Sequence, residues 1–306
     1  MTAPASRISA ASSDHVRIVE VGPRDGLQNE KAMVSTADKI ALIERLANTG
    51  LTSVEATAFV SPRWVPQMAD AAEVYAGITK RDGVRYPVLV PNLQGFDRAR
   101  RVGVSEIAVF GAASESFSKA NINATIAESL ERFAPVLDAA KRDGVAVRGY
   151  VSTVLGCPYQ GEVAVSDVVR VAKALFEMGC YEISLGDTIG VGTPRKARAM
   201  LEAVASEVPM TALAVHFHDT YGQAVANVAA CLEAGVRVVD AAVSGTGGCP
   251  YAKGSSGNVA SEDIVYLLDG MGFAHGVDLD ALIATGRWLS ALLGRDSMSK
   301  VNRARQ

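Results

Sequence analysis

The chain alternates eight times between two hydrophobic periods, and this alternation limits the folds open to it. Short runs rich in β-branched residues recur, and segments with a 3.6-residue apolar period lie between them. Strands that are joined by crossover helices must run parallel. The expected strands cover residues 16–22, 52–57, 85–90, 104–110, 145–152, 180–186, 212–218 and 236–243.

Eight such units favour a closed barrel over an open, doubly wound sheet. The chain has 306 residues, of which 49% are hydrophobic, and this suffices for a barrel with a large core. One more helix, at about 278–293, follows the eighth unit and is expected to cap the barrel or pack outside it. We therefore predict an α/β protein in which residues 15–306 form a single (β/α)8 TIM barrel with an additional C-terminal helix. Residues 1–14 are expected to form a flexible tail.

Charge and cysteine usage exclude several classes of function. The formal net charge is −3 and no apolar run reaches membrane-spanning length, so neither nucleic acid nor a membrane is an expected partner. The absence of CxxC pairing and of a disulfide rhythm argues against a zinc–thiolate site. The first fourteen residues lack the hydrophobic core of a secretory signal, which makes a cytoplasmic location the expectation.

Polar side chains gather near the expected carboxyl ends of the strands, where barrel enzymes build their sites. His216 and His218 share one face of the seventh strand. The other side chains expected to line the barrel mouth are Ser53, Glu55 and Thr57; Arg148, Tyr150 and Ser152; Ile183, Leu185 and Asp187; and Glu20 and Asp240. Burying so many ionisable groups is unfavourable unless they pair, bind a metal or meet a polar substrate. The pattern therefore indicates an enzyme.

A metal site is the most specific chemistry that this pattern predicts. Asp25 follows the first strand, which must lie beside the eighth for the barrel to close, and Asn258 follows the eighth strand. Two imidazoles with oxygen donors suit Mg²⁺ or Mn²⁺ better than a structural zinc site. Each residue also has a structural reading: a hydrogen-bonded histidine pair, an ion pair of Arg24 with Asp25, or a cap made by Asp187.

Residues 244–258, SGTGGCPYAKGSSGN, form a glycine-rich loop after the eighth strand. The loop could cradle a phosphate group but lacks the Lys-Ser/Thr ending of a P-loop, so nucleotide hydrolysis is not expected. Cys249 lies in this loop above the expected site, and Cys157, which also follows a strand, is a rival reactive thiol. Cys180 and Cys231 have the surroundings of small core residues.

Seven segments of the sequence resemble the hydroxymethylglutaryl-CoA lyases, which belong to the DRE-TIM metallolyase group. The resemblance covers nearly the whole chain from about residue 16. The matching segments are GPRDGLQNEK (22–31), FVSPRWVPQMAD (59–70), SKANIN (118–123), GYVSTVLGCPYQG (149–161), SLGDTIGVGTP (184–194), HFHDTYGQA (216–224) and GTGGCPYAKGSSGNVASED (245–263). Ala58 departs from the small polar residue expected there.

The resemblance implies a metal-dependent retro-Claisen cleavage of (S)-3-hydroxy-3-methylglutaryl-CoA to acetyl-CoA and acetoacetate, a step of leucine catabolism and ketone-body formation. It implies a divalent metal, Mg²⁺ or Mn²⁺, as cofactor. The implied metal ligands are Asp25, His216, His218 and Asn258. The implied catalytic residues are Arg24, Glu55, Tyr150, Asp187, His216 and Cys249. Arg24, Gln28 and Lys31 would contact the substrate, and Gln28 and Glu262 would support the metal shell.

The resemblance also implies a small-molecule acyl-CoA substrate and a homodimer or higher homo-oligomer. A lyase for a longer 3-hydroxy-3-isoprenylglutaryl-CoA and a Claisen-condensing synthase of the same group remain alternatives. A metal-dependent aldolase and a non-catalytic barrel are further ones, although the combination of Arg24, Asp25, the histidine pair and Cys249 argues against the last.

Overall fold

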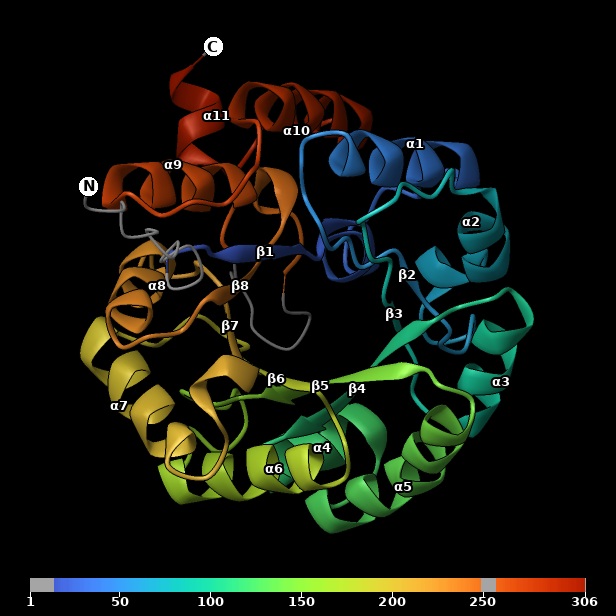
Figure 1. The fold of residues 1–306 in the computed structure, drawn as a ribbon, viewed down its shortest axis with the longest axis vertical. Helices are drawn as coiled ribbons and strands as arrows, with labels where there is room; N and C mark the ends of the chain where they lie inside the picture. Colours follow the sequence, from blue (N-terminus) through green and yellow to red (C-terminus); the bar gives the residue numbers. More distant parts are fainter. Residues whose placement is uncertain (1–13, 249–256, 306) are drawn as a thin grey trace, which may run out of the picture.

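The computed structural model describes residues 14–248 and 257–305 and forms a closed barrel of eight parallel strands (Figure 1). The strands follow one another around the sheet in the order β1-β8-β7-β6-β5-β4-β3-β2. Backbone bonds between β1 and residues 53–55 close the ring, because Glu20 N donates to Ser53 O (3.0 Å) and Glu55 N donates to Glu20 O (2.8 Å). The predicted TIM barrel is confirmed.

Each strand is followed by a helical layer that covers the outside of the barrel (Figure 1). The strands are β1 (Arg17–Glu20), β2 (Thr57–Ala58), β3 (Val88–Leu89), β4 (Glu106–Ala112), β5 (Ala146–Ser152), β6 (Glu182–Asp187), β7 (Leu213–Phe217) and β8 (Val238–Ala241). The α-helices are α1 (Thr36–Ala47), α2 (Ala71–Gly77), α3 (Leu93–Arg101), α4 (Glu115–Ile122), α5 (Ile126–Arg142), α6 (Val165–Glu177), α7 (Pro194–Ala205), α8 (Ala224–Glu233), α9 (Ser261–Met271), α10 (Leu279–Leu293) and α11 (Lys300–Ala304).

The C-terminal helices lie outside the ring, beside α1 and α9 (Figure 1). The predicted helix at 278–293 is α10, which begins where the Asp278 side chain accepts bonds from Asp280 N and Ala281 N (both 3.0 Å). The short helix α11 was not predicted. Within the described ranges, no helix is both long and apolar enough to cross a bilayer.

The second and third strands are shorter than predicted. Residues 53 and 54 pair with different neighbours, Arg85 and Glu20, through single bridges rather than a continuous ladder. The continuous ladder between β2 and β3 is therefore confined to two residue pairs, Thr57 with Val88 and Ala58 with Leu89.

The inside of the barrel is ionic around its middle. Arg148 of β5 pairs with Glu182 of β6 and Asp240 of β8, and Arg17 of β1 pairs with the other oxygen of Glu182. All except Arg17 are buried. A small apolar set lies above and below this network on the same strand faces: Val19, Val21, Ala214, Val238 and Ala242.

The predicted inward face of β6 is wrong. Glu182 and Ser184 point into the barrel, where they bond to Arg148 and Asp240, so Ile183 and Leu185 face outward. The Ile183 methyl lies beside Gly149 and the Leu175 side chain of α6. In a strand buried on both faces, the apolar residues pack under the helices, and hydrophobicity alone cannot identify the inner face.

Glu20 likewise does not join the barrel mouth. Its side chain points toward α9, where it accepts bonds from Gly22 N (2.7 Å), Val243 N (2.9 Å) and Ser261 Oγ. Burial raises the pKa of Glu20 to about 7. This carboxyl therefore ties the ends of β1 and β8 to the first turn of α9.

Candidate metal centre and active site

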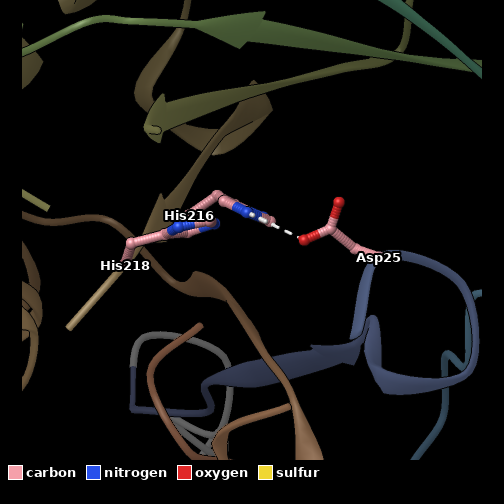
Figure 2. A group of neighbouring side chains, drawn as sticks. All are labelled: Asp25, His216 and His218. Carbon is pink, nitrogen blue, oxygen red and sulfur yellow. Dashed lines mark ion pairs between the residues drawn. The ribbon is translucent and has the colours of Figure 1, made fainter. Parts of the chain in front are cut away.

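Three predicted ligands meet at the carboxyl ends of β1 and β7. Asp25 lies in the helical turn Gly22–Gly26 that follows β1, while His216 lies in β7 and His218 just after it. One potential ligand atom from each residue lies within 4.8 Å of the others. Figure 2 shows both imidazoles beside the Asp25 carboxylate, with His216 Nε2 3.8 Å from Asp25 Oδ2. Barrel closure brings residues 191 positions apart in the sequence into one site, as predicted.

The chemistry of this group fits a divalent cation. Burial raises the pKa of Asp25, but Arg24 and the two histidines outweigh it and bring that pKa to about 2. Burial and the neighbouring His216 lower the pKa of His218 to about 4. At neutral pH the site therefore holds an ionised carboxylate beside a neutral His218 imidazole, which is the protonation state that binds metals.

Two further observations support this fit. His218 Nδ1 is buried and has no hydrogen-bond partner among the described residues, and such a group normally requires one. Asn258 pairs with His218 through a backbone bridge, and its side-chain nitrogen donates to Asp25 Oδ2 (2.9 Å). The predicted fourth ligand thus contacts two of the other three, Asp25 and His218.

A buried ion pair stands beside this centre. Arg24 donates from Nε to Glu55 Oε2 (2.8 Å) and from Nη1 to Asp25 Oδ1 (2.6 Å). Burial would lower the pKa of Arg24, but Glu55 and Asp25 hold it above its usual range. The predicted ion pair of Arg24 with Asp25 is present, but Arg24 is buried rather than solvated, and Glu55 is its second partner. These pairs also fix a permanent positive charge at the barrel mouth.

Tyr150 lies between Arg24 and Arg148, the arginine of the buried ion pairs inside the barrel. Its hydroxyl donates to Glu55 Oε2 (3.2 Å), and its ring lies 5.3 Å from the Arg24 guanidinium and 4.9 Å from that of Arg148. Burial raises the pKa of Glu55, although Arg24 opposes the effect. Its second carboxyl oxygen, Oε1, is buried and has no partner among the described residues.

Asp187 holds the loop that follows β6. Its carboxylate accepts bonds from Gly192 N (2.7 Å) and Val191 N (3.2 Å), and burial raises its pKa. Helix α7 begins later, with Thr193 as its N-cap residue, so Asp187 caps the loop rather than the helix. The structural reading of Asp187 as the N-cap of the following helix is therefore wrong, and its catalytic role stays a prediction.

The remaining predicted residues differ in burial and in their partners. Gln28 is half-buried with a buried Oε1 that lacks a partner in the described chain, and Lys31 is exposed. Glu262 is fully buried beneath the start of the loop after β8, where it accepts bonds from Ser244 N and Asn302 Nδ2. Cys249 lies outside the described residues.

The other three cysteines are buried. The Sγ atom of Cys157 accepts a bond from Ser114 Oγ (2.9 Å), so this thiol is packed rather than open to the barrel mouth. Burial raises the pKa values of Cys180 and Cys231 to about 12, in agreement with their predicted core positions.

Two polar residues that bond to Arg148 and Asp240 inside the barrel were not predicted. Ser184 and Glu182 shape the surroundings of Asp240 and Arg148, but the sequence reasoning assigned the opposite face of β6 to the interior. The alternation of Glu182 and Ser184 on one strand face was the signal that could have found them.

Comparisons with known proteins place the chain among lyases. The HMGL-like family model matches residues 15–289. The chain is 59% identical over 294 residues to a hydroxymethylglutaryl-CoA lyase of Gallus gallus described as mitochondrial, and the alignment covers 96% of this chain and 99% of the relative. It is 58% identical over 289 residues to a 3-hydroxy-3-isohexenylglutaryl-CoA/hydroxy-methylglutaryl-CoA lyase of Pseudomonas aeruginosa, over 94% of this chain and 96% of that protein.

The fold is equally similar to that of a solved relative. The structure of hydroxymethylglutaryl-CoA lyase from Pseudomonas aeruginosa superposes with a TM-score of 0.94 and 58% identity, and the match covers 95% of this chain and 97% of that one. Other relatives, in mouse and rat, are described as cytoplasmic. The matched family span includes every candidate site residue from Arg24 to Glu262.

Proposed function

The chain belongs to the HMGL-like family, and from this membership we propose that it is a hydroxymethylglutaryl-CoA lyase. It would cleave (S)-3-hydroxy-3-methylglutaryl-CoA to acetyl-CoA and acetoacetate. The observation that carries this proposal is the meeting of Asp25, His216 and His218 beside the buried Arg24 at the barrel mouth.

The reaction breaks a carbon–carbon bond next to a tertiary alcohol. The alcohol loses its proton, the bond electrons leave as the enolate of acetyl-CoA, and that enolate gains a proton at carbon. Asp25, His216, His218 and Asn258 would hold Mg²⁺ or Mn²⁺. When bound, such a cation lowers the pKa of an alcohol that it contacts.

Arg24 would stabilise the enolate oxygen. Its guanidinium is buried, permanently charged and held by two carboxylates, so it need not reorganise when negative charge develops nearby. The hydroxyl proton would pass to Asp187 through water, because His216 Nε2 would hold the metal and His216 Nδ1 faces Asp240. The raised pKa of Asp187 suits a proton acceptor. Glu55 and Tyr150 would orient the substrate, Gln28 and Lys31 would contact it, and Cys249 would deliver the proton to carbon.

An assay of metal-stripped protein tests this proposal. Acetoacetate and acetyl-CoA should form only after Mg²⁺ or Mn²⁺ is restored. Asp25→Asn and Arg24→Gln should lower kcat by about 10²–10³-fold or more while leaving the circular dichroism spectrum unchanged. Asp143→Asn, which breaks the exposed pair with Arg100, is the matched control and should retain activity. Cleavage at the normal rate by both site variants contradicts the proposal.

A longer substrate is the second candidate, because the name of the Pseudomonas relative includes an isohexenylglutaryl thioester. Comparing kcat/KM for the two thioesters in the same assay decides between them.

We further propose a role in leucine catabolism and ketone-body formation, a cytoplasmic location and a homodimer or higher homo-oligomer. Cell fractionation and light scattering of the purified protein test the last two.

A further inference from the structure

Asp240 of β8 lies directly behind His216, on the side away from Asp25. His216 Nδ1 is 3.2 Å from Asp240 Oδ2, whereas His216 Nε2 is the ring atom nearer to Asp25. Both side chains are buried, with at most 9% of either exposed. The imidazole is therefore held between two carboxylates, of which only one belongs to the candidate metal group.

We propose that Asp240 is a positioning residue that fixes the metal-binding form of His216, and that Arg148 and Ser184 set the strength of this contact. The inference rests on the proposed metal site but not on which thioester is cleaved.

The partners of Asp240 leave it only the role of acceptor. Arg148 donates to both of its oxygens, from Nη2 to Oδ1 (2.7 Å) and from Nη1 to Oδ2 (2.9 Å), and Ser184 Oγ donates to Oδ2 (2.8 Å). An acceptor at this position requires an N–H on His216 Nδ1. A neutral imidazole with its proton on Nδ1 carries its lone pair on Nε2, which faces Asp25.

The buried ion pairs of Arg148 with Asp240 and Glu182 prevent Asp240 from turning away. Arg148 is itself fixed from below, because its Nε donates to Glu182 Oε1 (2.7 Å) and Glu182 pairs with Arg17 of β1. Partners of this kind orient metal ligands, and their loss typically lowers metal affinity by about 10–100-fold. This accounts for a fully buried arginine in the middle of the barrel.

The number of donors at Asp240 Oδ2 leads to a prediction that would not follow if Asp240 only stabilised the fold. Three donors share this oxygen: His216 Nδ1, Ser184 Oγ and Arg148 Nη1. Ser184→Ala removes one competitor, so the His216 contact should strengthen and Mn²⁺ should bind more tightly, by about 2–5-fold on the scale of a partly recovered hydrogen bond. Asp240→Asn removes the obligate acceptor and should weaken Mn²⁺ binding by about 10–100-fold.

The experiment titrates metal-free full-length protein with Mn²⁺ and follows free Mn²⁺ by electron paramagnetic resonance. Ser129→Ala is the matched control, because it also removes a buried serine hydroxyl, in α5 and far from β8, and should not change the affinity. Thermal unfolding monitors the fold of each variant. Equal Mn²⁺ affinity for wild type, Asp240→Asn and Ser184→Ala would overturn the inference.

A second readout needs neither metal nor substrate. The chain has four histidines, so ¹⁵N-histidine spectra can be assigned by substitution. In metal-free wild type at mildly alkaline pH, His216 should be protonated on Nδ1, and a wild-type His216 protonated on Nε2 refutes the inference even if Asp240→Asn fails to fold. If these results hold while no thioester is cleaved, the lyase proposal fails and the positioning role stands.

Discussion

Replacing Glu262 with glutamine should make the protein more stable than wild type at alkaline pH. The Glu262 carboxyl is fully buried in the first turn of α9, where it accepts bonds from Ser244 N (3.0 and 3.1 Å) and Asn302 Nδ2 (3.1 Å). Burial raises its pKa from 4.5 to about 8. Glutamine keeps the acceptor oxygen and has no charge to bury.

The direction in which pH changes the free energy of unfolding depends on whether the folded or the unfolded protein binds the Glu262 proton. Between pH 4.5 and about 8 the folded protein keeps the Glu262 proton and the unfolded chain has released it. The stabilising contribution is therefore fully present below pH 4.5 and is lost as the pH rises through about 8. Each pH unit in this interval lowers the free energy of unfolding by about 1.4 kcal/mol, so the whole interval lowers it by about 5 kcal/mol.

Guanidinium unfolding of wild type and Glu262→Gln at several values between pH 5 and 9 measures this effect. The difference in unfolding free energy should be small at pH 5 and grow in favour of the variant to several kcal/mol at pH 9. Glu20, whose pKa is also raised, is present in both proteins, so the difference isolates the Glu262 carboxyl together with its electrostatic coupling to Glu20. The same substitution at the exposed Glu177 of α6 is the control. Curves for Glu262→Gln and wild type that stay parallel over the whole range refute the reasoning.

Three further substitutions probe the barrel mouth. Arg24→Lys keeps the positive charge but loses the guanidinium geometry that meets Glu55, so kcat should fall by about 10²–10³-fold in the acetoacetate assay. Gly26→Ala would place a methyl carbon 2.3 Å from Thr246 Oγ1, and calorimetry should show about 1–3 kcal/mol of lost stability; an unchanged melting temperature contradicts the close packing. Tyr150→Phe removes one 3.2 Å bond but keeps the ring, so thermal unfolding should show a loss of only about 0.5–1.5 kcal/mol.

The sequence was sufficient for the fold because its signals are local. Alternating periods located all eight strands, and parallel order followed from the intervening helices. The inner face of β6 was not predictable in this way. Both faces of that strand are buried, and the two inward polar residues, Glu182 and Ser184, take their meaning only from partners on other strands.

In the candidate site, too, some contacts could be predicted from the sequence and others could not. Asp25, His216 and His218 could be grouped because barrel closure dictates that β1 lies near β7 and β8. The pairing of Arg148 with Asp240 joins residues 92 positions apart on strands that are not neighbours in the sheet, and no periodicity encodes such a contact. Long-range ionic pairs inside a barrel require the three-dimensional register of its strands.

The closure of β1 against β8 also sets when the centre can form during synthesis. Asp25 emerges early, but its partner Asn258 follows about 230 residues later, which at roughly 5–20 residues per second is a delay on the order of ten to fifty seconds. Ser261, whose hydroxyl donates to the Glu20 carboxylate, is synthesised about as late. For that time the nascent chain exposes an unpaired first strand and no complete set of ligands. A divalent cation at the proposed site therefore finds its four proposed ligands together only after nearly the whole chain has left the ribosome.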